Sequence, residues 1–486
     1  MTEAERQSSL TRREFVRAAG AAGIGVLAAA GRGDAALPGA ARPNIVYVFA
    51  DQHRNCSWSG GGDPQVKTPN LESLAREGVV FNHCISNDPL CSPHRASLLT
   101  GRYPQANKVT KNVSSTEDKG LPATEVTIGE VLKNAGYATG YVGKRHLYPG
   151  APGGSMVDVV PPGPHRHGFD YWRACHNYRK RYDTRYYNDN GKEIVIPGYA
   201  PTGQMDLTLE FIEKNAARPF CVFLSWHPPH GPYTEAPKRF VDMYSPDKIN
   251  LRPNVPKEAD TRKWREHHAG YFAHVSALDE EMGRLIKKLA QLEIAGNTIL
   301  CYSSDHGDML ASLGMTTKNK PWEESINVPF VIRWPRRIPA GRRLDTLFST
   351  VDVTPTLLGL AGVPVLPRMQ GLDLSPVVQG KSVRGPESVF IMAAGGASDD
   401  DDEGKSKSRK GSAVTKKRIK GWRGIRTARH TYVKRGAKDG FDPWLLYDNE
   451  KDPFQMRDLI DDPAHQQTRK ELDAKLGQWR RRVGEA

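Results

Sequence analysis

Long apolar runs are missing from this 486-residue chain. No stretch reaches the roughly 18 residues that a membrane-spanning helix needs, so we expect no stable membrane span. Cysteine is also scarce, with six in the whole chain, and Cys221 and Cys301 lie in apolar runs typical of buried strands. In a chain of this length disulfides are optional, although Cys56, Cys84 and Cys175 are left as residues that could pair.

Charge is plentiful but unevenly placed. The hydrophobic content of 38% and charged content of 26% are typical of a soluble globular protein, and the length favours two domains. The net charge of +14 would suit a polyanion, yet much of the excess lies between Lys405 and Arg435 and in the N-terminal arginines. A basic face for acidic substrates stays open. A solvated basic loop is the interpretation we favour, and no nucleic-acid partner is expected.

Residues 1–41 are predicted to be an export signal. The charged stretch Thr11–Arg17 ("TRREFVR") precedes the apolar run Ala18–Ala30, which is rich in alanine and glycine. This order is typical of secretory signals, and the paired arginines resemble a twin-arginine signal. An amphipathic N-terminal helix is the alternative. We expect a periplasmic or extracellular location, with cleavage somewhere between Ala28 and Ala41.

Strands and helices are predicted to alternate along the body of the chain. Ile45–Phe49 is a continuous apolar run that ends at Asp51, as a central strand of a buried parallel sheet does. Helix-like and strand-like stretches then follow in turn, among them "PNLESLAREG", "VVFNHCI", "TIGEVLKNAG", "YATGYVGKRHL" and "NTILCYSSDHGDM". The alternation predicts an α/β fold with a mostly parallel sheet flanked by helices.

Polar residues gather where four of these strands end. Ligand sites of open α/β sheets lie at the carboxyl ends of strands, so we expect these side chains to share one site. Carboxylates, an amide and an imidazole suit a hard cation such as Ca²⁺ or Mg²⁺. A turn at each strand end is the alternative for any one pair. The residues are Asp51, Gln52, Lys144, His146, His227, His230, Asp305 and His306.

The stretch "CSPHRASLLTGR" places Cys91 directly before a predicted helix and four residues before Arg95. A cation and a helix N-terminus each favour negative charge, so both would help a reactive thiol. A packed core cysteine explains the same position equally well from local physics. The motif Cys91-x-Pro93-x-Arg95 followed by "ASLLTGRYP" resembles the signature of the type I sulfatases, in the alkaline-phosphatase-like superfamily.

The resemblance covers about residues 42–480, with further blocks in family order such as "PHGPY", "YSSDHGDML" and "WEESINVPFVIRWP". It implies that a dedicated formylglycine-generating enzyme converts Cys91 to formylglycine, although His94 stands where the family usually has Ser or Ala. It implies Ca²⁺, with Mg²⁺ as the alternative, and a set of ligands taken residue by residue from the family: Asp51, Gln52, Cys91, Asp305 and His306.

The same resemblance implies roles for the catalytic residues. Arg95 is expected to hold the formylglycine, and Lys144 and Lys318 to contact sulfate oxygens. His230 is expected to protonate the leaving alcohol, alone or with Lys318. The proton-accepting roles fall to Asp305, for the first attack, and to His146, for the second hydroxyl of the hydrated aldehyde. "TTKNKPWEE" also offers Lys320 in place of Lys318, and His227 is expected to support the site.

The predicted domains are a catalytic domain at 42–380 and a C-terminal α+β subdomain at 381–486, with an acidic-then-basic insertion at about 395–421. We expect a sulfatase acting on a sulfated carbohydrate. Substrate contacts are expected in the Pro/Gly-rich stretch from Pro149 and in the Arg- and Tyr-rich stretch from Arg173. Two alternatives are a phosphodiesterase or phosphonate monoester hydrolase of the same superfamily, and a non-catalytic sulfated-glycan binder.

Overall fold

The central strand β1 (Asn44–Asp51) is buried on both sides, as its apolar run predicts. Its successive residues serve two separate cores, with Ile45, Tyr47 and Phe49 on one face and Val46, Val48 and Ala50 on the other. The computed structural model describes residues 42–114, 118–150, 159–176, 181–394, 421–437 and 440–485. The predicted export signal at 1–41 and nearly all of the predicted insertion at 395–421 lie outside these residues.

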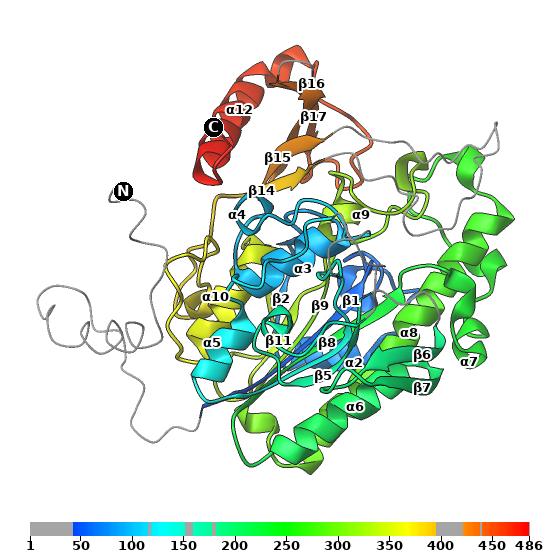
Figure 1. Cartoon of the computed structure of the whole chain (residues 1–486). Coiled ribbons are helices and arrows are strands. Elements are labelled where there is room, and N and C mark those ends of the chain that lie inside the picture. The colour runs from blue at the N-terminus through cyan, green and yellow to red at the C-terminus, as the bar shows by residue number, and fades with distance from the viewer. Residues whose placement is uncertain are drawn as a thin grey trace, which may run out of the picture. The chain divides into compact units, whose positions relative to one another are not determined.

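A ten-stranded sheet carries the fold (Figure 1). Its central strands β9, β1, β8, β4 and β5 run parallel, and antiparallel strands lie toward both edges, so the sheet is mixed. Strand order is β12 (Arg342–Leu344), β2 (Val79–Phe81), β11 (Val331–Arg333), β9 (Thr298–Ser304), β1, β8 (Phe220–Pro229), β4 (Ala138–Lys144), β5 (Tyr171–Cys175), β6 (Tyr182–Tyr187) and β7 (Glu193–Tyr199).

Helices cover both faces of this sheet. One face packs against α3 (Cys91–Thr100), α5 (Ile128–Asn134) and α10 (Thr350–Leu360). The other packs against α2 (Pro69–Arg76), α6 (Ala200–Asn215) and α8 (Arg262–Gln291). Short helices complete the set: α4 (Pro104–Asn107), α7 (Lys238–Val241), α9 (Glu323–Ile326) and α11 (Ser375–Val378).

Two smaller sheets complete the described part. An antiparallel sheet of β14 (Ser388–Ala393), β15 (Trp422–Thr427), β16 (His430–Ala437) and β17 (Gly440–Asp448) packs against α12 (Gln466–Arg482). The fold prediction, a large sheet flanked by helices plus a small C-terminal α+β part, is confirmed. A three-stranded sheet contains β10 (Asn327–Val328), β3 (Cys84–Ile85) and β13 (Phe348–Ser349).

The prediction of one strand for "VVFNHCI" was wrong. The stretch forms β2 and β3, which belong to different sheets, and the polar pair Asn82-His83 separates them.

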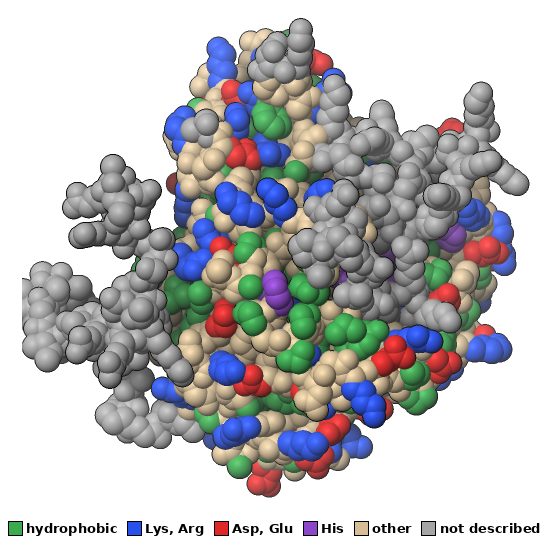
Figure 2. All heavy atoms as spheres, in the orientation of Figure 1, with side chains coloured by type: hydrophobic (Ala, Val, Ile, Leu, Met, Phe, Trp, Pro, Cys, Tyr) green, Lys and Arg blue, Asp and Glu red, His purple; other side chains and the backbone are tan. Residues whose placement is uncertain are grey.

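All six cysteines are free thiols, so the pairings left open for Cys56, Cys84 and Cys175 are not made. Within the described ranges, no helix has the length and apolar character to cross a membrane. On the face in Figure 2, basic side chains lie among acidic ones.

Candidate active site

Four neighbouring strands bring the predicted residues to one edge of the sheet. β9, β1, β8 and β4 are adjacent and parallel, so their carboxyl ends meet. Asp51 ends β1, Lys144 ends β4, His230 follows β8 and Asp305 follows β9. All four residues are buried. The helix α3 begins beside them with Cys91 as its first residue.

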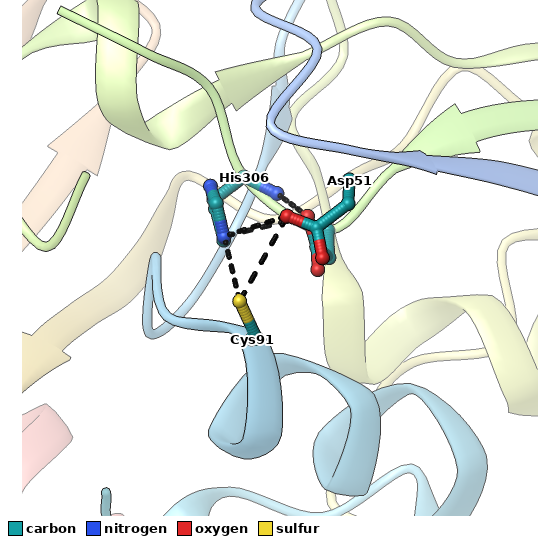
Figure 3. Close-up of side chains that lie close together, drawn as sticks. Asp51, Cys91 and His306 are labelled. Carbon is teal, nitrogen blue, oxygen red and sulfur yellow. Dashed lines mark hydrogen bonds and ion pairs between the residues drawn. The ribbon is translucent and has the colours of Figure 1, made fainter. Parts of the chain in front are cut away.

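Donor atoms from four of the predicted metal ligands converge (Figure 3). One atom each from Asp51, Cys91, Asp305 and His306 lies within 4.8 Å of the others. His306 Nδ1 lies 3.0 Å from the Gly307 carbonyl and donates to it, so the lone pair of Nε2 faces the cluster. Burial lowers the pKa of His306, which keeps the ring neutral near pH 7.

The inner oxygens of this cluster need a cation between them. His306 Nε2 lies 3.6 Å from Asp51 Oδ1 and 3.5 Å from Asp305 Oδ1. With a neutral imidazole, its lone pair therefore faces two carboxylate oxygens in a buried place, of which Asp305 Oδ1 also accepts from the Gln52 and His306 backbone amides. Such an arrangement is costly unless a positive charge fills it. The residues present thus fit a bound divalent cation, and two carboxylate oxygens favour a hard one.

The outer oxygens of the two carboxylates are held by fixed cations. Arg95 Nη2 donates to Asp51 Oδ2 at 3.0 Å and to Asp305 Oδ2 at 2.9 Å. Lys144 Nζ donates to Asp51 Oδ2 at 2.7 Å. Burial alone would raise the pKa of Asp51, but Lys144, His230 and Arg95 outweigh it and hold that pKa well below its usual range. Asp51 is therefore ionised and oriented with Oδ1 inward.

Cys91 is fully buried and protonated in its thiol form. Its Sγ lies 3.3 Å from His306 Nε2 and 3.7 Å from Lys144 Nζ. Burial, followed by the charge of Asp51, raises the pKa of Cys91 to about 12. Neither the helix N-terminus nor Lys144 overcomes these effects. The interpretation of Cys91 as a reactive thiolate therefore fails for the unmodified side chain.

A second cluster joins Lys318, Gln52 and His230. Lys318 Nζ lies 2.9 Å from His230 Nε2 and donates to Gln52 Oε1 at 3.1 Å. His230 Nδ1 lies 2.9 Å from the Gly231 carbonyl, which fixes a proton on Nδ1 and leaves Nε2 as an acceptor. Lys320 Nζ instead donates to the Lys318 carbonyl at 2.9 Å. Of the two lysines, it is Lys318 that contacts His230.

The remaining predicted histidines stand around these clusters. The His146 ring packs edge-on against His176 with centroids 5.0 Å apart, and its carbonyl accepts from Ser92 Oγ at 2.6 Å. His94 Nδ1 lies 2.9 Å from Ser86 Oγ, which donates onward to the Asp305 carbonyl at 2.7 Å. His94 thus points toward the loop that carries Asp305.

Three further residues support the site and were not singled out by sequence reasoning. Arg181 Nη1 lies 2.8 Å from His227 Nδ1, and its Nη2 donates to the His230 carbonyl at 2.7 Å. Asp308 accepts from Gln52 Nε2 at 2.7 Å and from the Tyr233 hydroxyl. Asp308 follows His306 by two residues in the same polar stretch, and that proximity was the available signal.

A family model for sulfatases matches residues 43–363. Among curated proteins, an ulvan-active sulfatase of Formosa agariphila is 35% identical over 457 residues, which cover 91% of this chain and 82% of that protein. An endo-4-O-sulfatase of Bacteroides thetaiotaomicron is 31% identical over 468 residues, covering 86% and 88%.

A solved structure has the same fold as this chain. It comes from work on glycosaminoglycan metabolism by Bacteroides thetaiotaomicron, has a TM-score of 0.80 and is 29% identical. The superposition covers 91% of this chain and 97% of that one. The similarity extends across the large sheet and the C-terminal part together.

Proposed function

Because this chain belongs to the sulfatase family and is therefore a sulfuric ester hydrolase, we propose that it releases sulfate from a sulfated carbohydrate. The Formosa agariphila relative is active on ulvan, which supports a polysaccharide substrate. The similar solved structure, which comes from work on glycosaminoglycan metabolism, supports the same class of substrate. The observation that carries the proposal is the buried convergence of Asp51, Cys91, Asp305 and His306 at one sheet edge.

We propose that Cys91 is converted to formylglycine by a formylglycine-generating enzyme before the protein acts. The raised pKa of the thiol supports this, because a neutral buried thiol is a poor nucleophile. The hydrated aldehyde supplies a hydroxyl nucleophile at the same place. Lys144 Nζ, 3.7 Å from Sγ, and Arg95 then offset the charge that develops there.

Asp51, Asp305 and His306 are proposed to hold Ca²⁺, with Mg²⁺ as the alternative. Gln52 Oε1 keeps a second lone pair beside the one that Lys318 uses, so it can join the set together with the modified Cys91. The cation, when bound, polarises sulfate oxygens and lowers the pKa of a bound hydroxyl. The inward Oδ1 of Asp305 is the proposed acceptor for the nucleophile's proton.

The leaving alcohol is proposed to take its proton from the pair formed by His230 and Lys318. A sugar alkoxide is a poor leaving group, so a positioned acid is needed in the transition state. His230 Nε2 accepts from the Lys318 ammonium, so His230 can act as the acid once a proton has passed from Lys318 to Nε2, and Nε2 then gives that proton to the alcohol. His146 is the proposed base for the second hydroxyl of the hydrated aldehyde. Its carbonyl accepts a hydrogen bond from Ser92, the residue next to Cys91.

Residues 1–41 are proposed to export the chain to the periplasm or to the outside of the cell. An exported enzyme can reach extracellular polysaccharides. The catalytic domain is proposed to end near residue 380, before β14 begins the small sheet at Ser388. The stretches from Pro149 and from Arg173 remain the proposed substrate contacts. Residues 151–158 and 177–180 of these stretches lie outside the described part of the chain.

The test combines intact-mass analysis with a substrate panel. Co-expression with a formylglycine-generating enzyme should change the mass of the peptide containing Cys91 from thiol to aldehyde. The purified protein should then release sulfate from at least one of ulvan, chondroitin sulfate and heparan sulfate fragments, and the Cys91→Ala variant should release none. Near-normal sulfate release by Cys91→Ala would exclude the mechanism. Turnover of phosphonate or phosphate esters with no sulfate release would exclude the proposed function.

A further inference from the structure

We infer that Asp308 is a positioning residue for the proton-donating pair, because it holds the Gln52 amide in a single orientation against Lys318. The inference rests on the proposed function, since it gives Asp308 a task in that reaction. It concerns a carboxylate that no step of the mechanism above uses.

Asp308 is anchored and fully buried. Its Oδ1 accepts from the Leu310 backbone amide at 2.9 Å, which fixes the carboxylate to its own loop. Its Oδ2 accepts from Gln52 Nε2 at 2.7 Å and from the Tyr233 hydroxyl. Both oxygens are therefore used as acceptors, and Oδ2 faces two donors.

This arrangement permits only one orientation of the Gln52 amide. A flipped amide would direct Oε1 at the Asp308 carboxylate and the NH₂ group at the Lys318 ammonium, so both contacts would become repulsive. In the orientation observed, Gln52 Oε1 accepts from Lys318 Nζ at 3.1 Å. The carboxylate thus determines, through the amide, which acceptor Lys318 meets.

The amide also lies between two opposite charges. Lys318 binds Gln52 Oε1, and Asp308 binds Gln52 Nε2, so the amide bridges the ammonium and the carboxylate. If the amide were lost, Lys318 could turn from His230 toward the buried carboxylate, which is a stronger acceptor. The proton of the leaving alcohol would then be supplied less well. The expected defect is therefore specific to poor leaving groups.

A charge swap tests this inference. Gln52→Glu places a second carboxylate against Asp308, and Asp308→Asn removes the acceptor that Gln52 uses. The double variant reverses donor and acceptor, because the amide introduced at position 308 can donate to the carboxylate introduced at position 52. Each single variant should lower kcat on the best sugar sulfate of the panel by about 10²-fold, the low end of general acid catalysis. The loss of Asp308→Asn on 4-nitrophenyl sulfate should be much smaller. Gln52→Glu also changes a proposed metal ligand, so its metal content is measured beside its activity, and the double variant should recover most of the activity on the sugar sulfate.

The controls separate positioning from folding. Asp279 is another buried carboxylate, which accepts from the Asn70 and Leu71 backbone amides and so ties α2 to α8. Asp279→Asn should lower the melting temperature and leave the sugar-to-aryl activity ratio unchanged. If Gln52→Glu does not fold, Asp308→Asn alone carries the test, and the same change in the sugar-to-aryl ratio is expected of it.

Two results would overturn the inference. One is an equal loss on sugar and aryl sulfates in Asp308→Asn, with its metal content unchanged. The other is additive losses in the double variant, in both activity and melting temperature. Failure of the proposed function looks different, because the wild type would then release no sulfate while the melting temperatures of the four proteins still showed the Gln52–Asp308 coupling.

Discussion

The two oxygens of Asp51 have different partners. Oδ2 binds Arg95 and Lys144, whereas Oδ1 faces His306 and Cys91. Asp305 is divided in the same way, with Oδ2 on Arg95 and Oδ1 toward His306. Fixed cations therefore hold the outer oxygens. Asp51 Oδ1 faces inward, and Asp305 Oδ1 does so while it accepts from the Gln52 and His306 backbone amides.

Removal of one carboxylate charge should remove the metal. Asp305→Asn takes a negative charge from the cluster and, because the Gln52 and His306 backbone amides donate to Oδ1, leaves an NH₂ group facing Arg95. We expect loss of bound divalent cation, measured by elemental analysis, and a fall in kcat/KM beyond the roughly 100-fold that loss of an outer partner costs. Asp279→Asn, far from the cluster, should keep its metal. Full activity of a metal-free wild type would contradict the site.

The His230 side chain should matter most when the leaving group is poor. His230→Ala should lower activity on a sugar sulfate by roughly 10²–10⁴-fold, as expected for loss of a general acid. A nitrophenolate leaves without a proton, so 4-nitrophenyl sulfate should lose far less. Equal losses on both substrates would assign His230 to sulfate binding and move the acid role to Lys318.

At the scale of elements, the small C-terminal sheet supports the loop that carries Lys318. Trp422 of β15 donates its Nε1 proton to the Asn319 carbonyl at 3.3 Å, and Trp322 donates to the Tyr447 hydroxyl of β17 at 3.2 Å. Side chains of this sheet also pack with Met309 and Met315 in one apolar cluster. The sheet thus fixes the backbone on either side of Lys318.

The helix that begins with Cys91 ends at a glycine with a left-handed conformation. Gly101 has φ 64°, and an added Cβ would lie 3.3 Å from Met369 Cγ. Gly101→Ala should therefore lower the free energy of unfolding by about 1 kcal/mol. Gly477 is the matched control, because it lies inside α12 and an added Cβ would make only an ordinary contact, at 3.8 Å from Arg481 Nη1. Gly477→Ala should raise stability by about 0.5–1 kcal/mol in chemical denaturation. Shifts of the same sign would contradict this account.

Across the whole molecule, burial keeps histidines neutral and makes the fold sensitive to acid. Burial lowers the pKa of six histidines outside the metal cluster to about 3 or 4: His53, His94, His167, His176, His268 and His274. The unfolded chain protonates these groups near pH 6.5, whereas the folded chain does not. Unfolding below that pH therefore takes up protons, and stability falls as the pH falls.

Buried carboxyls act in the opposite direction. Burial raises the pKa of Asp279 and Asp352 to about 6, and it also raises the pKa of Asp88, Glu130, Glu281 and Asp458. Histidines outnumber them, because burial also lowers the pKa of His83, His165, His227, His306 and His430, so a net loss of stability is expected. We predict that the melting temperature decreases steadily from pH 7 to pH 5, measured by differential scanning calorimetry in buffers of equal ionic strength. A constant or rising melting temperature over this range would contradict the prediction.

The sequence alone determined the elements and the set of chemical groups. An apolar run such as Ile45–Phe49 can be buried on both faces only at the centre of a covered sheet, and it forms β1. Polar residues at the ends of parallel strands must share one edge, so Asp51, Lys144, His230 and Asp305 do meet. These inferences succeeded because they depend on local pattern and on the direction of the strands.

Only the tertiary structure decided which partner each side chain meets. The charge state of the Cys91 thiol depends on burial and on Asp51, 40 residues away in the sequence. The choice of Lys318 over Lys320 and the Gln52–Asp308 contact depend on how the loops after β1 and β9 pack. Local patterns do not contain this information, because hydrogen bonds and desolvation act over a few ångströms in space between residues that are far apart along the chain.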